Sequence, residues 1–570
     1  MQGSESFEIL TAKRLDHLPL VSACMRYLEI GQIIDELVDS HKLNCVSTGE
    51  CLQAMVLSIL TGQHALYKVS EVLGDYDTEI VFQKQIKAES FHDNRLGAAL
   101  DQMWEAGLGM LYSKLIAKAI MKYSLGLEKL HFDTTSISLY GAYEQEEDGD
   151  DIPRITYGHS KDKRTDLKQV LFGMTVSGDG GVPLTGRITS GNTSDSTENR
   201  FNLETLREIV PDISRSILVS DSKFFSAPTV EMAFEQGISF ISLMPKTVGM
   251  YEEILKEDKP SEILLTTPGR RKGEYEEYRG FSLIAPYVYK TDNAEQRHRQ
   301  MRFVVVESTA LQKQKERVWK AKKEKEYQGL TKLSQGIQKR EFACEEDALR
   351  EIDKLRKQIK VDYHRLGFER EKRTVIEKRQ HRGRPRAGEQ LPQRESWTVN
   401  LSFQEDAEHL SQSKQRLNKF ILVTNILDSS RMTDAEILKA YKGQSSVETN
   451  FKWAKNPAAV APIFLKDPKR IAVLGFVYLV ALMVYTLMQR QIRQSLKRDQ
   501  KSIPGNKGLT DNPTGRVLFQ NMRGIAVVVV SLGESVFKQV TNFTQLHEDI
   551  LNYFAFDTAI YQSLKTISSA

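Results

Sequence analysis

The order of strand-like and helix-like segments between residues 127 and 243 limits the possible folds of this 570-residue chain most strongly. Three segments alternate apolar and polar residues as β-strands do, at 127–139, 170–176 and 182–188. A helix, an apolar strand, a second helix and a second apolar strand are predicted next, at 197–210, 216–220, 228–236 and 238–243. This series predicts an α/β domain built on one sheet.

The chain on either side of this segment falls into regions of different composition. Residues 1–124 place apolar side chains three and four positions apart, so we expect a helical N-terminal domain there. Residues 311–388 contain 24 Lys and Arg against 13 Asp and Glu, and a strand-like segment at 420–424 then resumes the α/β pattern. We therefore predict a catalytic core in two parts, residues 125–310 and 416–495. A large basic insertion, residues 311–415, interrupts this core, and a C-terminal region, residues 496–570, follows it.

The element order of the α/β segment is that of a ribonuclease-H-like domain, and two aspartates lie at its strands. Asp133 is in the middle of an apolar strand, where a carboxylate is costly to bury unless it is paired or holds a metal. Asp221 directly follows the strand at 216–220, and open α/β sheets place ligand groups at such strand ends. Either aspartate alone is also compatible with a turn or a helix cap.

A third carboxylate, Glu448, lies in a helix predicted from about residue 434 to residue 453. Steps of three, four and seven residues separate Tyr441, Gln444, Glu448 and Lys455, which keeps all four on one helix face. A carboxylate between a phenol and an ammonium group suits a surface that holds phosphate beside a metal. The alternative is a solvated amphipathic face.

These residues resemble the DDE insertion-sequence transposases of the insertion-sequence-four superfamily, whose signature is Tyr-x2-Arg-x3-Glu-x6-Lys. Tyr441, Glu448 and Lys455 match that spacing, and Gln444 stands where the signature has Arg. Glutamine can donate hydrogen bonds but lacks the charged guanidinium fork, so one phosphate contact is weakened.

Three further blocks resemble the same superfamily, at 157–169, 183–195 and 220–226, so that the resemblance spans about residues 125 to 490. It implies an enzyme that moves an insertion sequence by nicking the element ends, forming hairpins and transferring strands into target DNA. It also implies that residues 1–124 bind DNA. The alternative is a domesticated or nuclease-type ribonuclease-H-like DNA-binding protein that no longer transposes, although such proteins usually lose one of the three carboxylates.

The predicted metal ligands are Asp133, Asp221 and Glu448, with Asp133 as the bridging ligand. Carboxylate oxygens without clustered Cys or His suit Mg²⁺ or Mn²⁺ more than zinc. Two such ions about 4 Å apart can activate the attacking oxygen and stabilise the leaving one in phosphoryl transfer.

Several other side chains are predicted to contact DNA. Tyr441, Gln444 and Lys455 would hold the phosphate beside the scissile bond. A basic run could follow the backbone or could be an exposed loop; its members are Lys161, Lys163, Arg164 and Lys168. Arg382, Arg384 and Arg386 form either a motif that binds the DNA minor groove or a solvated loop. Trp397 and Trp453 either stack on an unpaired base or belong to the core.

The expected partners are double-stranded DNA, as element ends and as target, and a second copy of the chain in a synaptic complex. Residues 471–488 are uncharged over a length near the minimum for a membrane span, but an all-apolar helix also suits a large core. Because the surrounding sequence is typical of soluble DNA-processing proteins, we favour the buried helix and no membrane. The N-terminus lacks the apolar region of a secretion signal, so we expect a cytoplasmic, nucleoid-associated protein.

Overall fold

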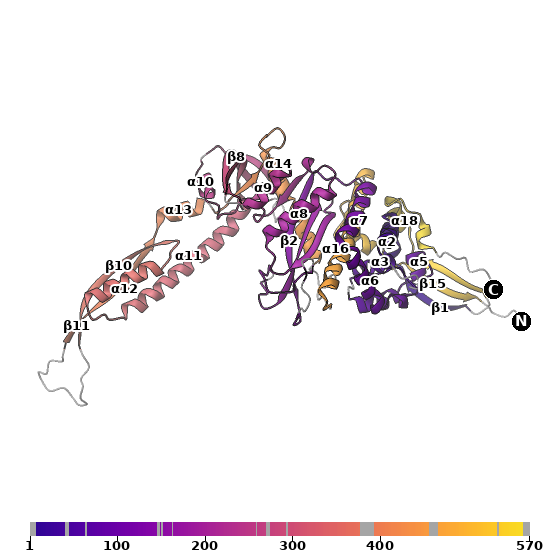
Figure 1. Cartoon of the computed structure of the whole chain (residues 1–570), viewed down its shortest axis with the longest axis horizontal. Coiled ribbons are helices and arrows are strands. Elements are labelled where there is room, and N and C mark those ends of the chain that lie inside the picture. The colour runs from indigo at the N-terminus through magenta and orange to yellow at the C-terminus, as the bar shows by residue number, and fades with distance from the viewer. Residues whose placement is uncertain are drawn as a thin grey trace, which may run out of the picture. The chain divides into compact units, whose positions relative to one another are not determined.

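The computed structural model describes residues 7–39, 45–62, 65–144, 149, 152–161, 163–257, 259–268, 274–291, 295–376, 393–415, 417–454, 465–532 and 535–562. The chain forms two compact units (Figure 1). The first unit comprises Met1–Pro245, Ile284–Arg302 and Val423–Ala570, and the second comprises Lys246–Leu283 and Phe303–Leu422.

Five strands of the first unit form the sheet segment that carries the predicted aspartates. In chain order they are β2 (Lys129–Leu139), β3 (Lys168–Ser177), β4 (Pro183–Ser190), β5 (Ile217–Ser220) and β6 (Ser239–Leu243). They lie in the order β4-β3-β2-β5-β6, with β2, β3 and β4 antiparallel and with β5 and β6 parallel to β2. The predicted strands are all present, in a mixed α/β arrangement with a large sheet.

Four more strands extend the sheet to nine. They follow β6 in the order β12 (Lys419–Thr424), β9 (Gln296–Ser308), β8 (Tyr275–Lys290) and β7 (Glu262–Pro268). The division between the two units falls within β8, β9 and β12. Strand β12 is the segment predicted to resume the α/β pattern after the insertion.

Helices of the first unit connect or follow these strands. Helix α8 (Asp195–Ile209) contacts β2 and β4, and α9 (Ala227–Glu235) joins β5 to β6. The single helix predicted over residues 434–453 is wrong, because the chain forms α14 (Asp434–Lys442) and α15 (Ser445–Ala454) with a turn at Gly443 and Gln444.

The N-terminal part of the first unit is made mostly of helices. They are α1 (Leu18–Tyr27), α2 (Ile30–Leu37), α3 (Thr48–Leu60), α4 (Val69–Gly74), α5 (Thr78–Phe82), α6 (Asp93–Ala106) and α7 (Leu108–Tyr123). Strand β1 (Phe7–Arg14) precedes them and pairs antiparallel with β15 (Ala526–Leu532), which pairs with β16 (Ser535–Thr541). Strand β1 therefore differs from the all-helical expectation, because its partner is near the other end of the sequence.

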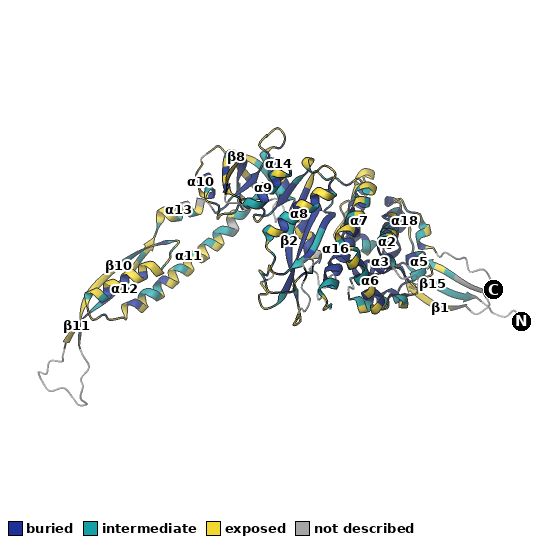
Figure 2. Cartoon of the chain, in the orientation of Figure 1, coloured by how far each residue is buried: buried dark blue, intermediate teal, exposed yellow. Residues whose placement is uncertain are grey.

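Helix α16 (Pro468–Asp499) is the long apolar helix considered as a membrane span. In its most apolar stretch of 18 residues, 94% are buried inside the protein (Figure 2). It contacts β4 as well as α3, α6 and α7, and then α17 (Gly515–Asn521) and α18 (Gln545–Tyr553). The short strands β13 (Ile503–Gly505) and β14 (Gly508–Thr510) follow it. Such burial is what the core helix of a folded domain shows.

The second unit contains the predicted insertion. Its helices are α10 (Met250–Lys256), α11 (Thr309–Gln338), α12 (Glu345–Gln358) and α13 (Ala407–Gln415), and an antiparallel pair is formed by β10 (His364–Ile376) and β11 (Gln393–Glu405). A small hydrophobic core joins α11 and α12 to β11, with Ile337, Ile352 and Val399 buried in it. The basic insertion is therefore a folded element and not a linker.

Candidate active site

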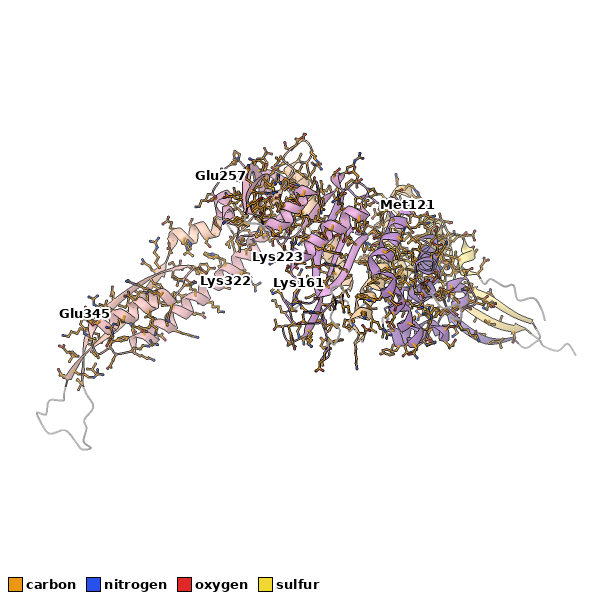
Figure 3. All side chains as sticks on the ribbon, viewed as in Figure 1. Met121, Lys161, Lys223, Glu257, Lys322 and Glu345 are labelled. Carbon is orange, nitrogen blue, oxygen red and sulfur yellow. The ribbon has the colours of Figure 1, made fainter. Side chains whose placement is uncertain are left out.

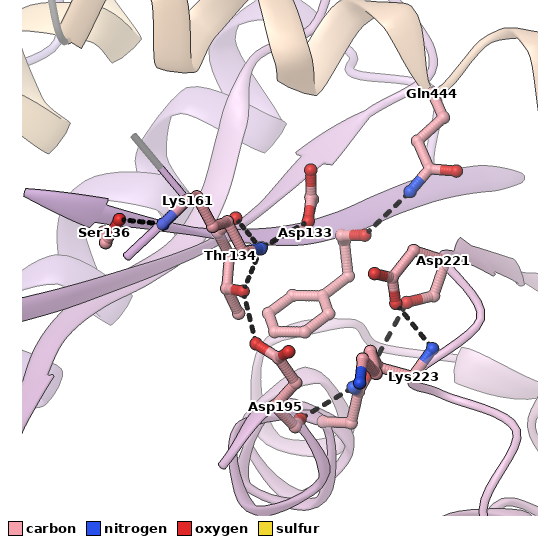
Figure 4. Close-up of polar contacts among 11 residues, drawn as sticks. Asp133, Thr134, Ser136, Lys161, Asp195, Asp221, Lys223 and Gln444 are labelled. Carbon is pink, nitrogen blue, oxygen red and sulfur yellow. Dashed lines mark hydrogen bonds and ion pairs between the residues drawn. The ribbon is translucent and has the colours of Figure 1, made fainter. Parts of the chain in front are cut away.

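Asp133 and Asp221 lie at equivalent positions of two neighbouring parallel strands. His131 on β2 is the partner of Val219 on β5 in the register, and each aspartate comes two residues after its member of this pair. Side chains two residues apart point to the same face of a sheet, and neighbouring strands are about 4.8 Å apart. The sheet therefore brings the two carboxylates together (Figure 4).

Both carboxylates are held in their neutral form more strongly than usual. Burial raises the pKa of Asp133 to about 6, and the nearby Asp221 carboxylate contributes to the rise. Burial also raises the pKa of Asp221, with a contribution from Asp195. Backbone N–H donors partly compensate the charges, from Thr134 to Asp133 Oδ1 at 2.7 Å and from Lys223 to Asp221 Oδ1 at 2.9 Å. Burial therefore makes ionisation of both groups less favourable than it is in water.

Helix α15, which carries Glu448, packs on β2 and β3. Val447 and Phe451 are buried, and the Phe451 ring packs edge-on against Phe172 of β3 at 6.3 Å between centroids. Asn450 donates its Nδ2–H to the carbonyl oxygen of Gly181, at 2.7 Å, which fixes the helix to the β3–β4 turn. Glu448 is exposed in the first helical turn, where a carboxylate is stabilised by the helix dipole.

Tyr441 of α14 links the three carboxylates. Burial raises the pKa of its phenol to about 12, and the charges of Asp221, Glu448 and Asp133 add to this rise. Such an effect requires all three acids to lie near the phenol oxygen, because charge interactions weaken with distance. Three carboxylates from β2, β5 and α15 therefore share one electrostatic environment, and Tyr441 remains a neutral hydrogen-bond donor at neutral pH.

Gln444 does not continue the helix face on which it was predicted. It lies in the turn between α14 and α15, is buried, and directs its Nε2 toward the Phe132 carbonyl oxygen of β2 at 3.5 Å. The neighbouring Gly443 explains the turn: a Cβ there would lie 3.0 Å from His131 Cε1 and from the Ala440 carbonyl oxygen. The helix breaks where its backbone comes close to the catalytic strand.

Comparison with known proteins agrees with this geometry. The family model described as a transposase DDE domain matches residues 128–484, which is more than half of the chain. The chain belongs to the DDE transposase family. A second model, described as a domain of unknown function (DUF4277), matches residues 10–117. No curated protein matches the chain.

Solved structures similar to this transposase are themselves transposases, although the likeness is low. A piggyBac transposase synaptic complex with hairpin DNA has 10% sequence identity and a TM-score of 0.38, and the match covers 94% of this chain and 85% of that chain. A pre-cleavage Mos1 transpososome has 10% identity and a TM-score of 0.15, covering 35% and 61%. A Mos1 paired-end complex with the left transposon end has 9% identity, the same TM-score and the same coverage. At these TM-scores the similarity carries no further argument.

DDE transposases generally use divalent metal ions, and the donor set of this transposase fits them. Asp133, Asp221 and Glu448 offer hard oxygen ligands, and burial, which raises the pKa of both aspartates, disfavours their charged forms in a way that a bound cation would offset. Among the described residues, no group of three or more His, Cys, Asp and Glu side chains is placed so that it could hold a metal ion. The three carboxylates therefore fit a divalent metal ion by the chemistry of their oxygen donors and by their charge.

The basic run of residues 161–168 separates into different roles. Arg164 is paired with Asp166 at 2.6 Å, and Lys168 donates to the carbonyl oxygens of Ala142 and Tyr143. Lys163 is exposed to solvent. Lys161 Nζ, in contrast, contacts β2, at 2.5 Å from the Thr134 carbonyl oxygen and 3.5 Å from Asp133 Oδ1 (Figure 4).

Two polar residues at the site carried no predicted role. Thr134 Oγ is 2.8 Å from Asp195 Oδ1, at the start of α8, and accepts a hydrogen bond from Lys161 Nζ at 2.7 Å. Asp195 is the last residue of the block 183–195, which resembles the transposase superfamily. That resemblance was the sequence signal that could have marked Asp195 as a site residue. The contact itself joins residues 61 positions apart and is not visible in the sequence.

Two glycines explain why two of these blocks occur together. A Cβ on Gly158 would lie 1.9 Å from the Gly191 carbonyl oxygen, and a Cβ on Gly191 would lie 2.1 Å from the Gln169 carbonyl oxygen. Gln169 is itself buried and donates its Nε2–H to the Gly191 carbonyl oxygen at 2.8 Å. The segments that carry Lys161 and Asp195 are thus held together by close backbone contacts.

The remaining predicted residues lie elsewhere or outside the described residues. Trp397 is partly buried against the small core of the second unit, and its backbone pairs with Phe342. Trp453 belongs to α15, but its side chain is outside the described residues. The residues that fall wholly outside them are Lys455, Arg382, Arg384 and Arg386.

Proposed function

We propose that this transposase carries out cut-and-paste transposition of an insertion sequence of the insertion-sequence-four type, by nicking, hairpin formation and strand transfer at the element ends. The observation that carries the proposal is the register of β2 and β5, which sets Asp133 and Asp221 at matching positions of neighbouring strands, with the helix of Glu448 packed on β2. The Tyr-x2-Gln-x3-Glu-x6-Lys spacing of the sequence supports the superfamily assignment.

Three carboxylates would hold two Mg²⁺ or Mn²⁺ ions, with Asp133 as the shared ligand and Asp221 and Glu448 each completing one ion. Bound there, the ions would supply Lewis-acid stabilisation to the attacking and leaving oxygens of a phosphodiester. The protein's own contribution would be placement: β2 and β5 hold the two aspartates in register, and α15, which carries Glu448, packs on β2 and is fixed to the β3–β4 turn.

Tyr441 and Lys455 would bind the phosphate next to the scissile bond. The Tyr441 phenol stays protonated at neutral pH, so it can donate a hydrogen bond to a phosphate oxygen without adding negative charge. Gln444 would support β2 through its contact with the Phe132 carbonyl oxygen instead of binding phosphate. The Arg of the superfamily signature therefore has no functional replacement at this position.

The second unit offers a basic surface for duplex DNA along α11. Lys322, Lys325 and Lys332 are exposed at spacings that keep them on one helix face, together with Gly329 and Gly336. Figure 3 labels Lys322 on this helix. Near its C-terminal end, α11 packs on the small core through Leu333 and Ile337. The three ammonium groups extend over about 15 Å of helix, so they would follow a phosphate backbone.

Synapsis of two element ends would require a homodimer on DNA, with the helical N-terminal domain and the arginines at 382, 384 and 386 adding DNA contacts. Trp453 is the better candidate for stacking on a base unpaired during hairpin formation, because Trp397 packs against the core of the second unit. Such an enzyme would act on the nucleoid in the cytoplasm.

The test is cleavage of a labelled duplex that carries the element's own end, with Mg²⁺ or Mn²⁺. Glu448→Gln should lower the cleavage rate about a thousandfold or more while DNA binding persists. Glu204→Gln, on the exposed surface of α8, is the matched control and should cleave at the normal rate. A product that snaps back on a denaturing gel would support the hairpin route, whereas undiminished cleavage by Glu448→Gln would exclude the proposed active site.

A further inference from the structure

The side chain of Lys161 is fixed on the catalytic strand from several directions. Its ammonium donates to the Thr134 carbonyl oxygen at 2.5 Å and to Thr134 Oγ at 2.7 Å, and it lies 3.5 Å from Asp133 Oδ1. Its backbone N–H donates to Ser136 Oγ at 3.0 Å. About a third of the side chain is exposed, at 31%, so it is partly withdrawn from solvent. A lysine in a free surface loop would not make this set of contacts.

Thr134 and Asp195 extend these contacts into a chain of hydrogen bonds. The Lys161 ammonium donates to Thr134 Oγ, and the Thr134 hydroxyl can then donate to Asp195 Oδ1, which is 2.8 Å away. Thr134 is buried, so the chain runs through a region of low dielectric where each bond strengthens the next. Asp195 therefore helps to hold the ammonium beside Asp133 without touching it.

The ammonium also acts on the second aspartate. Its charge lowers the pKa of Asp221 as well as that of Asp133, although burial outweighs this effect at both groups. Lys161 thus supplies positive charge at the place where the proposed function requires divalent cations. Two positive groups that share the same carboxylates must compete, because each lowers the negative charge available to the other.

We propose that the Lys161 ammonium is an internal counter-ion that competes with divalent metal for Asp133 and Asp221, held in position by Thr134 and Asp195. A DNA phosphate is a rival anion for the same ammonium. Engagement of DNA would withdraw Lys161 from the carboxylates, so metal binding and DNA binding favour each other. The inference rests on the proposed metal site and adds an order of binding: the affinity of the site for divalent metal rises once DNA is bound.

The test is Mn²⁺ titration of the full chain by calorimetry, without DNA and then with a duplex carrying the element end in Ca²⁺-free buffer under non-cleaving conditions at low temperature. Without DNA, Lys161→Met should bind Mn²⁺ about tenfold more tightly than wild type, because the competing charge is gone. With DNA the difference between the two proteins should narrow.

Two variants separate competition from other effects. Lys161→Arg keeps the charge and should bind Mn²⁺ much as wild type does. Lys163→Met removes one positive charge from the same segment without a contact to the carboxylates and should change Mn²⁺ affinity less than about twofold. Thermal unfolding should show Lys161→Met less stable than wild type without metal and restored by Mn²⁺, which keeps the test valid if the metal-free variant folds poorly.

The outcomes distinguish the two proposals. Equal Mn²⁺ affinity in wild type and Lys161→Met, with both abolished by Asp133→Asn, would overturn the counter-ion inference and leave the metal site intact. Absence of Mn²⁺ binding to every variant would overturn the inference together with the proposed metal site.

Discussion

The two units of this transposase carry their charges differently. The first unit buries several of them: Asp133 and Asp221 have raised pKa values, and Arg302, with only 4% of its side chain exposed, is paired with Asp434. Many ion pairs of the second unit lie at the surface. There Arg370 and Glu345 form an ion pair at 2.5 Å with both side chains more than 40% exposed.

The difference determines which conditions each unit responds to. Buried charges interact strongly with their neighbours and little with dissolved salt, so the first unit should respond to metal ions, protons and small steric changes. Exposed charges are screened over about 10 Å at 0.1 M salt, so the second unit should respond to ionic strength. Glycines follow the same division, since those near the active site lie against backbone and those on α11 face open space.

The largest effect is expected from Gly191→Ala in the first unit. The new Cβ would lie 2.1 Å from the Gln169 carbonyl oxygen and 2.7 Å from that of Thr156, and neither backbone group can move without disturbing β3. We expect the free energy of unfolding to fall by about 3 kcal/mol, as for severe overpacking. Cleavage should also fall, because the segment leading to Asp195 shifts. Denaturant unfolding measures the first effect, and an unchanged midpoint would contradict the close contact.

A smaller effect is expected from acid through His17. Its ring stacks on Phe519 at 4.1 Å, and burial lowers its pKa from 6.5 to about 4. Because the folded state binds the proton less readily than the unfolded state, the stabilisation is complete above pH 6.5 and is lost as the pH falls toward 4. Between pH 7.5 and pH 4.5 the loss should be about 2.5 kcal/mol.

His17→Phe keeps an aromatic ring against Phe519 but cannot be protonated. Thermal unfolding between pH 7.5 and pH 4.5 should therefore be less pH-dependent in this variant than in wild type. Parallel curves for the two proteins would show that another group causes the acid sensitivity of the first unit.

In the second unit, the triple substitution of Lys322, Lys325 and Lys332 by Gln should weaken duplex binding about tenfold near 0.1 M salt. The slope of log affinity against log salt should become shallower by about 2 to 3. Each phosphate contact that is lost reduces the number of counter-ions released from the DNA on binding. Fluorescence anisotropy over a salt series measures both.

The matched control lies on α12, where Arg350, Lys354 and Lys357 also share an exposed face. Arg350 is near Glu346 and Asp347, and Lys354 is near Glu351, so two of these three charges are already partly compensated. Their replacement by Gln should change the salt slope little. Equal slopes for both triple variants and wild type would remove α11 as a DNA-binding surface.

The smallest effect, of opposite sign to the first, is expected from Gly329→Ala on α11. No atom lies within 4 Å of the new Cβ, and alanine favours a helix interior by about 1 kcal/mol over glycine. Hydrogen exchange of the α11 amides should become slower by a corresponding factor of about two to five. Faster exchange would mean that the glycine is required for the helix.

Elements with a strong local pattern were predictable from the sequence. The strands β2 to β6 show the apolar runs of buried strands, and Asp133 and Asp221 stand out because they interrupt or end such runs. Glu448 was predicted from its spacing to Tyr441. All three therefore depend on neighbours within a few residues along the chain.

Features that depend on distant contacts were not predictable. The break at Gly443 arises from its approach to His131, more than 300 residues earlier, while the local sequence continues a helical pattern. Gln444 consequently lies against β2 and not on a phosphate-binding face. The link between Thr134 and Asp195 and the pairing of β1 with β15 were missed for the same reason.

Helix α16 has a consequence for how the protein is made. It packs against α3, α6 and α7, which precede it by several hundred residues, and β1 pairs along its length with β15. A chain emerging from the ribosome can form local helices early, but these helices have an open apolar face until residues 468–499 are synthesised. The N-terminal helices therefore complete their core only after the segment that carries Glu448 has been translated. Fragments that end before α16 would lack both a finished N-terminal core and the cover of β4, so a prematurely terminated transposase would be an unstable protein and not a free DNA-binding competitor.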